Sequence, residues 1–204
     1  DLRSNHRYDA TSFDAVDPLL GGDDALRRLT AAAHAHGIRV LGDFTTNHTG
    51  AGHAWFRAAL ADPAAPERAF YFIEDDGRYA AWLGIPSLPK LDHASPELRR
   101  RMFHDEHGVV RKWLGPDGGL DGWRVDVANM TGRHGGQDLN HAVAREMRVA
   151  SVAARADALV VAGRVDRLGS DQHRDADRAH LGALPALLPA AGVQAVDAAV
   201  VRAH

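Results

Sequence analysis

The chain has 204 residues, no cysteine, 25% charged residues and a formal net charge of −3. This profile is typical of one soluble globular domain, and it excludes disulfides and thiolate-bound metals. No apolar run approaches the roughly 18 residues of a membrane span, and the charge balance gives no basic patch for a nucleic acid. We therefore expect no membrane or nucleic-acid partner, and a small polar ligand is the partner class left open.

The compartment follows less directly from the sequence. The absence of cysteine agrees with a cytoplasmic protein. The first residues are polar and rich in turn formers, without the charged-then-apolar pattern of a signal peptide, so we expect them to come from inside a longer chain. Cytoplasmic location is the expectation, and secretion is not decided by this fragment.

The first predicted elements are a helix and a strand. Leu26, Leu29 and Ala33 recur at helical spacing, with Asp23 or Asp24 as the expected cap, and Gly37 stands where a C-terminal glycine belongs. The next residues, "IRVLGDF", form an apolar run that ends in an aspartate before the polar loop "TTNHTGAGH". This pattern predicts a strand that leads into a functional loop.

A long irregular stretch follows, from about residue 49 to 94, and it exceeds the ordinary connections of compact domains. "SPEL" then predicts a helix with Ser95 as its cap and Pro96 at its first position. Its expected inner face consists of Leu98, Met102, Val109, Val110 and Trp113. We expect one helix here, although Gly108 lies inside it.

The remainder repeats the rhythm of strand and helix. "GLDGWRVDVA" predicts a second strand, "DLNHAVAREMRVA" a helix and "ALVVA" a third strand. Continuous apolar strands that alternate with helices indicate a parallel sheet covered on both faces. The spacing is compatible with a (β/α) barrel and with an open doubly wound sheet, and it does not separate the two.

Acidic residues close both strong strands, at Asp43 and Asp126. Sites in parallel α/β folds lie at the carboxyl ends of strands, although a strand-end aspartate such as Asp43 also often caps the next element. Arg124 and Asp126 are two residues apart, so their side chains share one face. We expect the arginine to keep this carboxylate ionised with a low pKa, as suits a nucleophile in retaining glycoside hydrolysis. The alternative is a purely structural buried pair.

Four motifs together resemble those of a known family. "DFTTNH" and "GWRVDVAN" resemble the first and second conserved stretches of the alpha-amylase family, glycoside hydrolase family 13, in the family's order. "LPKLDH" and the upstream "SNHRYDATSFDAVDPLLGGDDALRRL" resemble the version of the neopullulanase and cyclomaltodextrinase subfamily. The resemblance covers residues 1–162. It implies part of a (β/α)8 TIM barrel with an insertion like the family's B domain, and hydrolysis of α-1,4 or α-1,6 bonds in alpha-glucans.

The resemblance also assigns roles to residues. Asp126 matches the catalytic nucleophile and Arg124 its partner, while His48 and Tyr8 match the histidine that donates to the substrate sugar and the aromatic that stacks on it. Asp43 becomes a structural or supporting acid. Asn47 matches a position that binds calcium in many amylases; because the subfamily does not always keep that calcium, we expect no metal and no cofactor.

The chain departs from the family pattern after residue 162. The family's acid catalyst is a glutamate at the end of the fifth barrel strand, and Gly163 occupies that place. Glu97 and Glu146 are predicted on helices that face away. A missing general acid typically removes a factor of ~10²–10⁴ in rate, so we expect little or no turnover. The competing hypothesis is a non-catalytic carbohydrate-binding or structural remnant; a weaker third is transglycosylation or isomerisation.

Residues 163–204 lack the family's closing His-Asp motif and contain no Phe, Trp or Tyr. We interpret this tail as an out-of-frame or otherwise unrelated terminus. Residues 1–162 would supply about three of eight barrel strands, leaving two open sheet edges. The 13 histidines are expected to have structural or surface roles, including His34, His36, His104 and His107.

Overall fold

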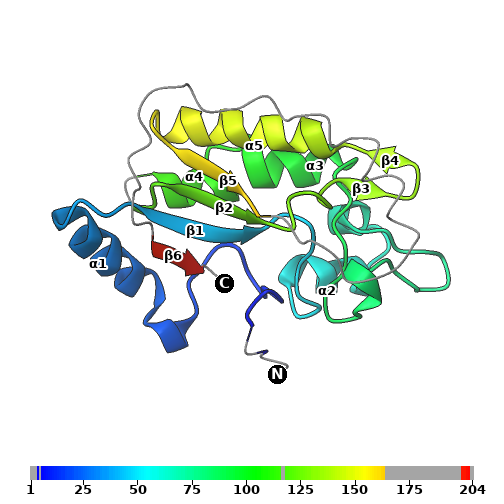
Figure 1. The fold of residues 1–204 in the computed structure, drawn as a ribbon. Coiled ribbons are helices and arrows are strands. Elements are labelled where there is room, and N and C mark those ends of the chain that lie inside the picture. The colour runs from blue at the N-terminus through cyan, green and yellow to red at the C-terminus, as the bar shows by residue number, and fades with distance from the viewer. Residues whose placement is uncertain (1–3, 5, 116–117, 164–198, 203–204) are drawn as a thin grey trace.

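The computed structural model describes residue 4 and residues 6–115, 118–163 and 199–202, the last four by their backbone alone. Its centre is a four-stranded sheet in the order β5-β2-β1-β6, with every neighbouring pair parallel (Figure 1). The strands are β1 (Val40–Thr45), β2 (Gly122–Asp126), β5 (Leu159–Ala162) and β6 (Ala199–Arg202). The three strands predicted from the sequence are confirmed.

The register between β1 and β2 places the two acidic strand ends together. Asp43 lies opposite Arg124, and Thr45 lies opposite Asp126. Paired residues of neighbouring strands point to the same face of a sheet, so the Asp43 and Arg124 side chains leave the sheet together. Strand pairing therefore brings the residues of two distant motifs to one place.

Four principal helices accompany the sheet. They are α1 (Gly22–Ala35), α2 (Ala54–Ala61), α4 (Val109–Leu114) and α5 (Asn140–Ala154). Figure 1 shows α4 and α5 along one side of the strands, while α2 lies beyond their carboxyl ends. None of the helices within the described ranges has the length and apolar character needed to cross a bilayer.

The ends of α1 follow the sequence only in part. Gly37, with φ of 71°, donates its N–H to the His34 carbonyl at 2.9 Å, which confirms the predicted C-terminal glycine. The predicted aspartate cap is wrong, because Gly21 is the N-cap and makes no side-chain hydrogen bond. Asp23 instead accepts the Val16 N–H at 2.8 Å, so it fixes the preceding loop.

The helix predicted after Ser95 is broken into three segments, so the expectation of one helix is wrong. They are α3 (Pro96–Arg99), a π-helical turn (Arg100–His104) and α4. The break lies at Gly108, where a Cβ atom would be 3.0 Å from the carbonyls of Arg101 and Asp105. The predicted Ser95 cap is confirmed by its bond from the Leu98 N–H at 3.3 Å, and the five predicted inner-face residues are all buried.

The long stretch between β1 and α3, which we call the insertion (residues 49–94), contains α2 and two 3-10 turns, Pro66–Phe70 and Trp82–Gly84. Its last residues return to the segment after β1, because Lys90 forms an antiparallel bridge with His48, and Leu91 pairs with Tyr71 within the insertion. A short hairpin of β3 (Arg133–His134) and β4 (Gln137–Asp138) follows β2. The exact boundaries of the insertion stay a prediction.

One of the two predicted open edges is covered. β6 lies beside β1, with Val40 opposite Ala199, so the expectation of a bare edge there is wrong. The physical reason is the apolar run "AAVV" in residues 198–201, which suits a parallel strand. The outer edge of β5 has no strand partner in the described part of the chain. The hypothesis about the tail falls mostly on residues 164–198, which lie outside the described residues.

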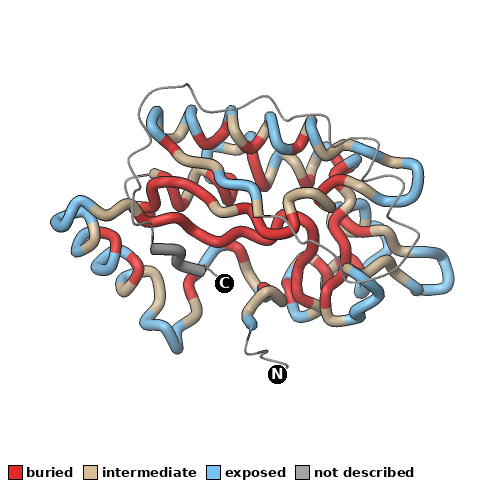
Figure 2. The backbone as a smooth tube through the Cα atoms, in the orientation of Figure 1, coloured by how far each residue is buried: buried red, intermediate tan, exposed pale blue. Residues whose placement is uncertain are grey.

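The core is centred on β1 and β2. All six residues of β1 and four of the five residues of β2 are buried, and Figure 2 shows the two strands as largely buried. Trp123 of β2 is 1% exposed and packs on Phe44 at 5.1 Å between ring centroids. The apolar core below the strand ends is therefore closely packed, and it fixes the positions of the polar residues at those ends.

Candidate functional site

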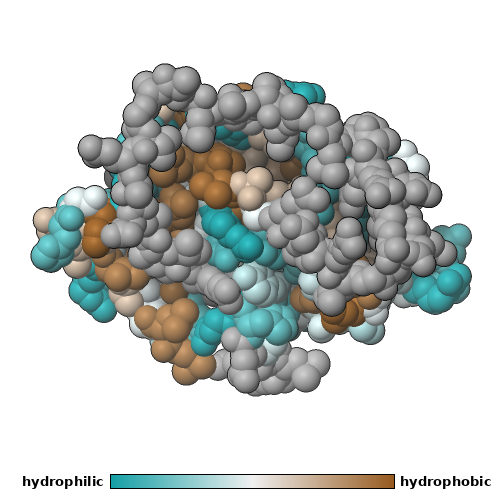
Figure 3. Space-filling model, viewed as in Figure 1, coloured by the Kyte–Doolittle hydropathy of each residue, from teal (hydrophilic) through white to brown (hydrophobic). Residues whose placement is uncertain are grey.

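The centre of the site is one guanidinium shared by two carboxylates. Nη1 of Arg124 donates to both Asp43 oxygens, at 2.9 and 3.1 Å, and also to Oδ1 of Asp126. Asp43 and Asp126 are 4% and 8% exposed. Two buried carboxylates on one cation carry a net negative charge, which suits a site where positive charge develops on a substrate. Figure 3 shows hydrophilic residues gathered in the middle of this face, next to hydrophobic ones.

The prediction that Asp126 has a low pKa is wrong. Burial removes water from the carboxylate and raises its pKa above the ordinary value of 3.8, and the nearby charge of Asp43 acts in the same direction. Arg124 lowers the pKa but does not outweigh the desolvation, because its cation is divided between two acids. Sequence reasoning counted one partner for Arg124 and missed the second.

The residue after Asp126 is strained. Val127 has φ of 44°, in the left-handed region that a β-branched residue rarely adopts, and its side chain is completely buried. A backbone hydrogen bond from the Val127 N–H to the Asp126 carboxylate lowers the pKa of this carboxylate. Such strain persists only where the surroundings enforce it, and it is common at functional sites. No signal in the sequence points to this conformation.

Gly163 lies directly beside the cluster, at the end of β5. Its N–H donates to the Val125 carbonyl at 2.7 Å, and its own carbonyl accepts from Ala128 at 2.9 Å. A Cβ atom on Gly163 would be 2.7 Å from Nε and Nη2 of Arg124. The position at which the sequence predicts the missing acid is therefore adjacent to the Arg124 cluster, and it carries no side chain. Arg124 takes up the space next to it.

His48 lies in the loop between β1 and α2, three residues after the end of β1, and is 1% exposed. Burial and then the charge of Lys90 lower its pKa to about 4, while the Tyr8 backbone beside the ring opposes the change. Its ring stacks on Trp82 at 5.6 Å. A neutral imidazole in such a place carries one N–H donor for a ligand hydroxyl. The structure thus brings Tyr8 and His48 together, although the Tyr8 ring stacks on His6 at 6.0 Å.

Asn47 does not present a calcium site. Its side-chain oxygen accepts from the Lys90 ammonium at 2.5 Å, and the same ammonium donates to the Met130 carbonyl at 3.1 Å. Lys90 is only 7% exposed, and burial lowers its pKa to about 8. A calcium ion on this oxygen would lie next to a buried ammonium, so the residues present do not fit the metal. The described residues also contain no group of three His, Asp or Glu side chains able to hold a metal.

The other residues singled out in the sequence have structural partners. His34 contacts Asp121 at 2.7 Å, and Glu146 binds both Arg99 and His104 on the outer helices. Glu97 is occupied by Arg100 and Arg101. These contacts agree with the expectation that neither glutamate faces the Arg124 cluster.

The family follows from a comparison of the whole chain. A family model described as alpha amylase, catalytic domain, matches residues 1–150. The chain belongs to the alpha-amylase family. The parallel sheet with its insertion is accordingly part of a (β/α)8 barrel, which confirms the predicted fold class.

Among known relatives, neopullulanase 2 of Thermoactinomyces vulgaris is 33% identical over 167 residues, which is 78% of this chain and 26% of that protein. An amylopullulanase of Thermoanaerobacter thermohydrosulfuricus is also 33% identical, over 62% of this chain and 10% of its own length. The alpha-amylase-family chain thus spans about a quarter or less of these two relatives. Both have names of enzymes that act on pullulan.

Solved structures give the same result. A protein of Thermus thermophilus superposes with a TM-score of 0.68 and 33% identity, over 81% of this chain and 34% of that one. A cyclic alpha-maltosyl-(1→6)-maltose hydrolase of Arthrobacter globiformis superposes with a TM-score of 0.66 and 31% identity, over 78% of this chain and 35% of that one. The chain is thus part of an alpha-amylase-family catalytic domain, and its activity and the roles of its individual site residues stay predictions.

Proposed function

We propose that the site cleaves α-1,4 or α-1,6 glucosidic bonds of alpha-glucans by a retaining mechanism, with Asp126 as the nucleophile. The observation that carries the proposal is the Arg124 guanidinium that holds Asp126 beside the packed end of β2. An oriented carboxylate can attack the anomeric carbon of the sugar. Relatives of the chain have names of enzymes that act on pullulan or cyclomaltodextrins, which supports this substrate class.

The reaction has two steps with different requirements. In the first, an Asp126 oxygen bonds to the anomeric carbon and the leaving oxygen departs with its electron pair. In the second, water replaces Asp126 at that carbon, and a general base takes the proton of the water. Gly163 supplies neither a proton for the first step nor a base for the second, so we expect very slow turnover of natural glucans.

The remaining groups of the site bind and orient. His48, neutral near pH 7 because burial lowers its pKa to about 4, donates to a sugar hydroxyl. Tyr8 provides the apolar ring for the same sugar. Asp43 keeps Arg124 in place. We propose that the site needs no calcium or other cofactor, since Lys90 occupies the Asn47 oxygen, and that the protein is cytoplasmic, which the absence of cysteine supports.

A substrate with a good leaving group tests the proposed nucleophile separately from the missing general acid. Nitrophenolate is a good leaving group, so p-nitrophenyl α-maltoside requires little proton donation. We expect a burst of about one nitrophenolate per chain followed by a slow phase, because the second step lacks its base. Azide is a nucleophile that needs no base, and it should accelerate the slow phase and give the α-glycosyl azide, which NMR identifies.

Asp126→Asn is the decisive variant, and it should lose the burst and the azide response together. Glu146→Gln is the matched control, since Glu146 binds only residues of the outer helices among its described partners. A burst that survives in Asp126→Asn contradicts the assignment of the nucleophile. An azide product of β configuration contradicts retention.

A non-catalytic carbohydrate-binding remnant is the second candidate, favoured by the bare Gly163 position at the Arg124 cluster. It predicts no burst from the parent chain together with measurable binding of maltoheptaose. Binding that weakens on His48→Ala would then assign the sugar to the surroundings of His48. The catalytic and the non-catalytic candidate therefore predict different results for the nitrophenolate burst, and both predict binding of maltoheptaose.

A further inference from the structure

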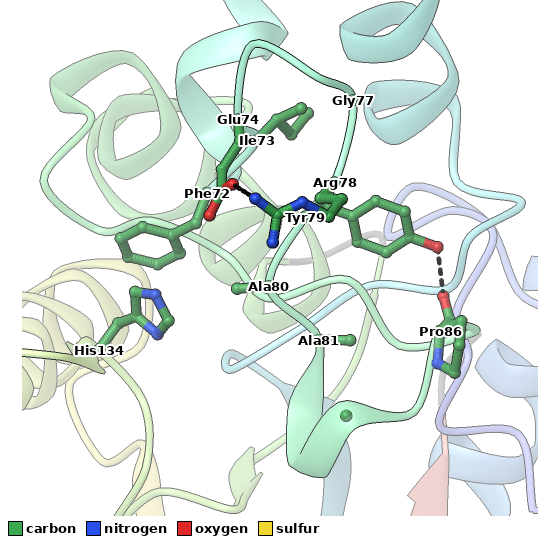
Figure 4. A pocket seen from close by; sticks show the side chains of 11 residues that line it. Phe72, Ile73, Glu74, Gly77, Arg78, Tyr79, Ala80, Ala81, Pro86 and His134 are labelled. Carbon is green, nitrogen blue, oxygen red and sulfur yellow. Dashed lines mark hydrogen bonds and ion pairs between the residues drawn. The ribbon is translucent and has the colours of Figure 1, made fainter.

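A second concave region lies on the insertion, away from the Arg124 cluster. It is a pocket of about 920 Å³, formed by the loop of residues 72–86 together with His134 from the hairpin after β2 (Figure 4). This volume lies within the range of ordinary small-molecule sites. We call it the insertion pocket. Its lining includes Phe72, Glu74, Arg78, Tyr79 and His134.

Rings from two separate segments form one side of the insertion pocket. Phe72 and His134 pack at 4.1 Å between ring centroids, so the pair joins the insertion to the hairpin. The Tyr79 hydroxyl donates to the Pro86 carbonyl at 2.9 Å, which fixes its ring along the loop, as Figure 4 shows. Small side chains, Ala80 and Ala81, lie between these groups. Fixed apolar ring surface beside open space is the usual means of binding the faces of a sugar.

The charged side chains at the insertion pocket are paired with one another, and the acids outnumber the arginine. Arg78 donates to Glu74 at 2.5 Å and to Asp76 at 2.7 Å, so its single positive charge faces two carboxylates. His134 adds no opposing charge near pH 7, because burial and then Lys90 lower its pKa. A phosphate or carboxylate ligand would meet net negative charge here. A neutral ligand with many hydroxyls can use the same oxygens and N–H groups as acceptors and donors.

We propose that the insertion pocket is an accessory binding site for a neutral oligosaccharide, a malto-oligosaccharide segment of an alpha-glucan, held on the Phe72 ring and by the Arg78–Glu74 pair. The proposal rests on the proposed function for its substrate class. The lining of the insertion pocket shares no residue with the Arg124 cluster, and the Trp82 side chain, between the pocket-lining Ala81 and Gly84, stacks on His48 instead.

Trp82 connects the insertion pocket with the region of the Arg124 cluster. Trp82 stacks on His48 and donates its indole N–H to the Met130 sulfur at 3.3 Å, so the loop that forms the insertion pocket also contacts the loop after β2. A glucan held in the insertion pocket is retained near the Arg124 cluster. Binding of a long chain would therefore be tighter than binding of maltose alone.

Calorimetry with maltoheptaose tests the proposal on the full chain carrying Asp126→Asn, which prevents turnover. Phe72→Ala should weaken binding by about tenfold, which corresponds to about 1.4 kcal/mol, because it removes the ring on which the sugar stacks. Phe72→Tyr, which keeps the ring, should bind as the parent does. Arg78→Ala should also weaken binding, whereas the matched control Arg100→Ala removes another exposed arginine held by two acids and should not.

Each outcome decides the proposal. Unchanged affinity in both Phe72→Ala and Arg78→Ala, with circular dichroism and urea midpoints like those of the parent, overturns it. Displacement of maltoheptaose by inorganic phosphate in the parent but not in Arg78→Ala also overturns it, because the pocket would then prefer anions. No binding by the parent, with the nitrophenolate burst present, overturns this inference and leaves the proposed function intact. Phe72-dependent binding without a burst supports the inference and removes the catalytic proposal.

Discussion

β1 and β5 both pair with β2, but they lie in very different surroundings. Every residue of β1 is buried, and its Asp43 binds Arg124. β5 is half-buried at Leu159 and Val160 and exposed at Val161 and Ala162, and it leads to Gly163. The Asp126 side of the candidate site is thus enclosed and paired, while the Gly163 side is open and bare. The difference teaches that the proposed nucleophile and binding groups can be assembled without a side chain at the position expected for the acid.

The largest effect should come from breaking the enclosed side. Arg124→Met removes the guanidinium that pairs with both Asp43 and Asp126. Two buried carboxylates then lose this shared cation, and we expect a loss of about 3–5 kcal/mol in the free energy of unfolding. Urea titration at pH 7 measures it. Arg100→Met, an exposed arginine with two acidic partners, should cost less than about 1 kcal/mol. Equal losses in the two variants would contradict the difference in burial.

The second-largest effect should be a loss of stability at acidic pH, caused by buried histidines. His48, His53 and His93 are buried, and burial lowers the pKa of each to about 4. In the unfolded chain these histidines take up a proton near pH 6.5, whereas in the folded chain they do so only near pH 4. The free energy of unfolding is therefore highest above pH 6.5 and decreases as the pH falls from 6.5 to 4. Each histidine contributes on the order of 3 kcal/mol between these limits.

Urea midpoints measured from pH 7 to pH 4 follow this loss. His53→Gln should reduce the slope, because one of the three groups no longer takes up a proton on unfolding. His107→Gln, at a fully solvated surface position 88% exposed, should leave it unchanged. An unaltered slope in His53→Gln would show that its imidazole does not resist protonation in the folded chain.

The smallest effect concerns the open side. Gly163→Ala places a Cβ atom 2.7 Å from the Val125 carbonyl and from the Arg124 guanidinium, and the carbonyl cannot move without disturbing β2. We expect a loss of about 1–3 kcal/mol in stability. Gly136→Ala is the matched control, since nothing lies within 4 Å of its added Cβ atom. If Gly163→Ala is as stable as the parent, the end of β5 is looser than its contacts indicate, and Gly163→Glu becomes a direct way to restore an acid.

Local patterns predicted most of the elements that carry the site. The apolar runs of β1, β2 and β5, the Ser95 cap and the Gly37 helix end follow from short-range chemistry, and each is confirmed. The errors have two kinds of cause. The pairing of β6 depends on a strand that is distant in the sequence, whereas the Gly21 cap and the break at Gly108 depend on contacts and backbone crowding within seven residues.

The sequence by itself determined the family, the residues at the strand ends and the absence of an acidic side chain at position 163, because motif identity and order are properties of the chain. Only the tertiary structure decided that Arg124 serves two carboxylates, that the pKa of Asp126 is raised and that Lys90 takes the Asn47 oxygen. It also decided where the insertion pocket lies. These properties depend on desolvation and on distances between segments up to about 80 residues apart, such as Asp43 and Arg124. The sequence shows which ionisable side chains are present, and the fold decides which of them are buried close together.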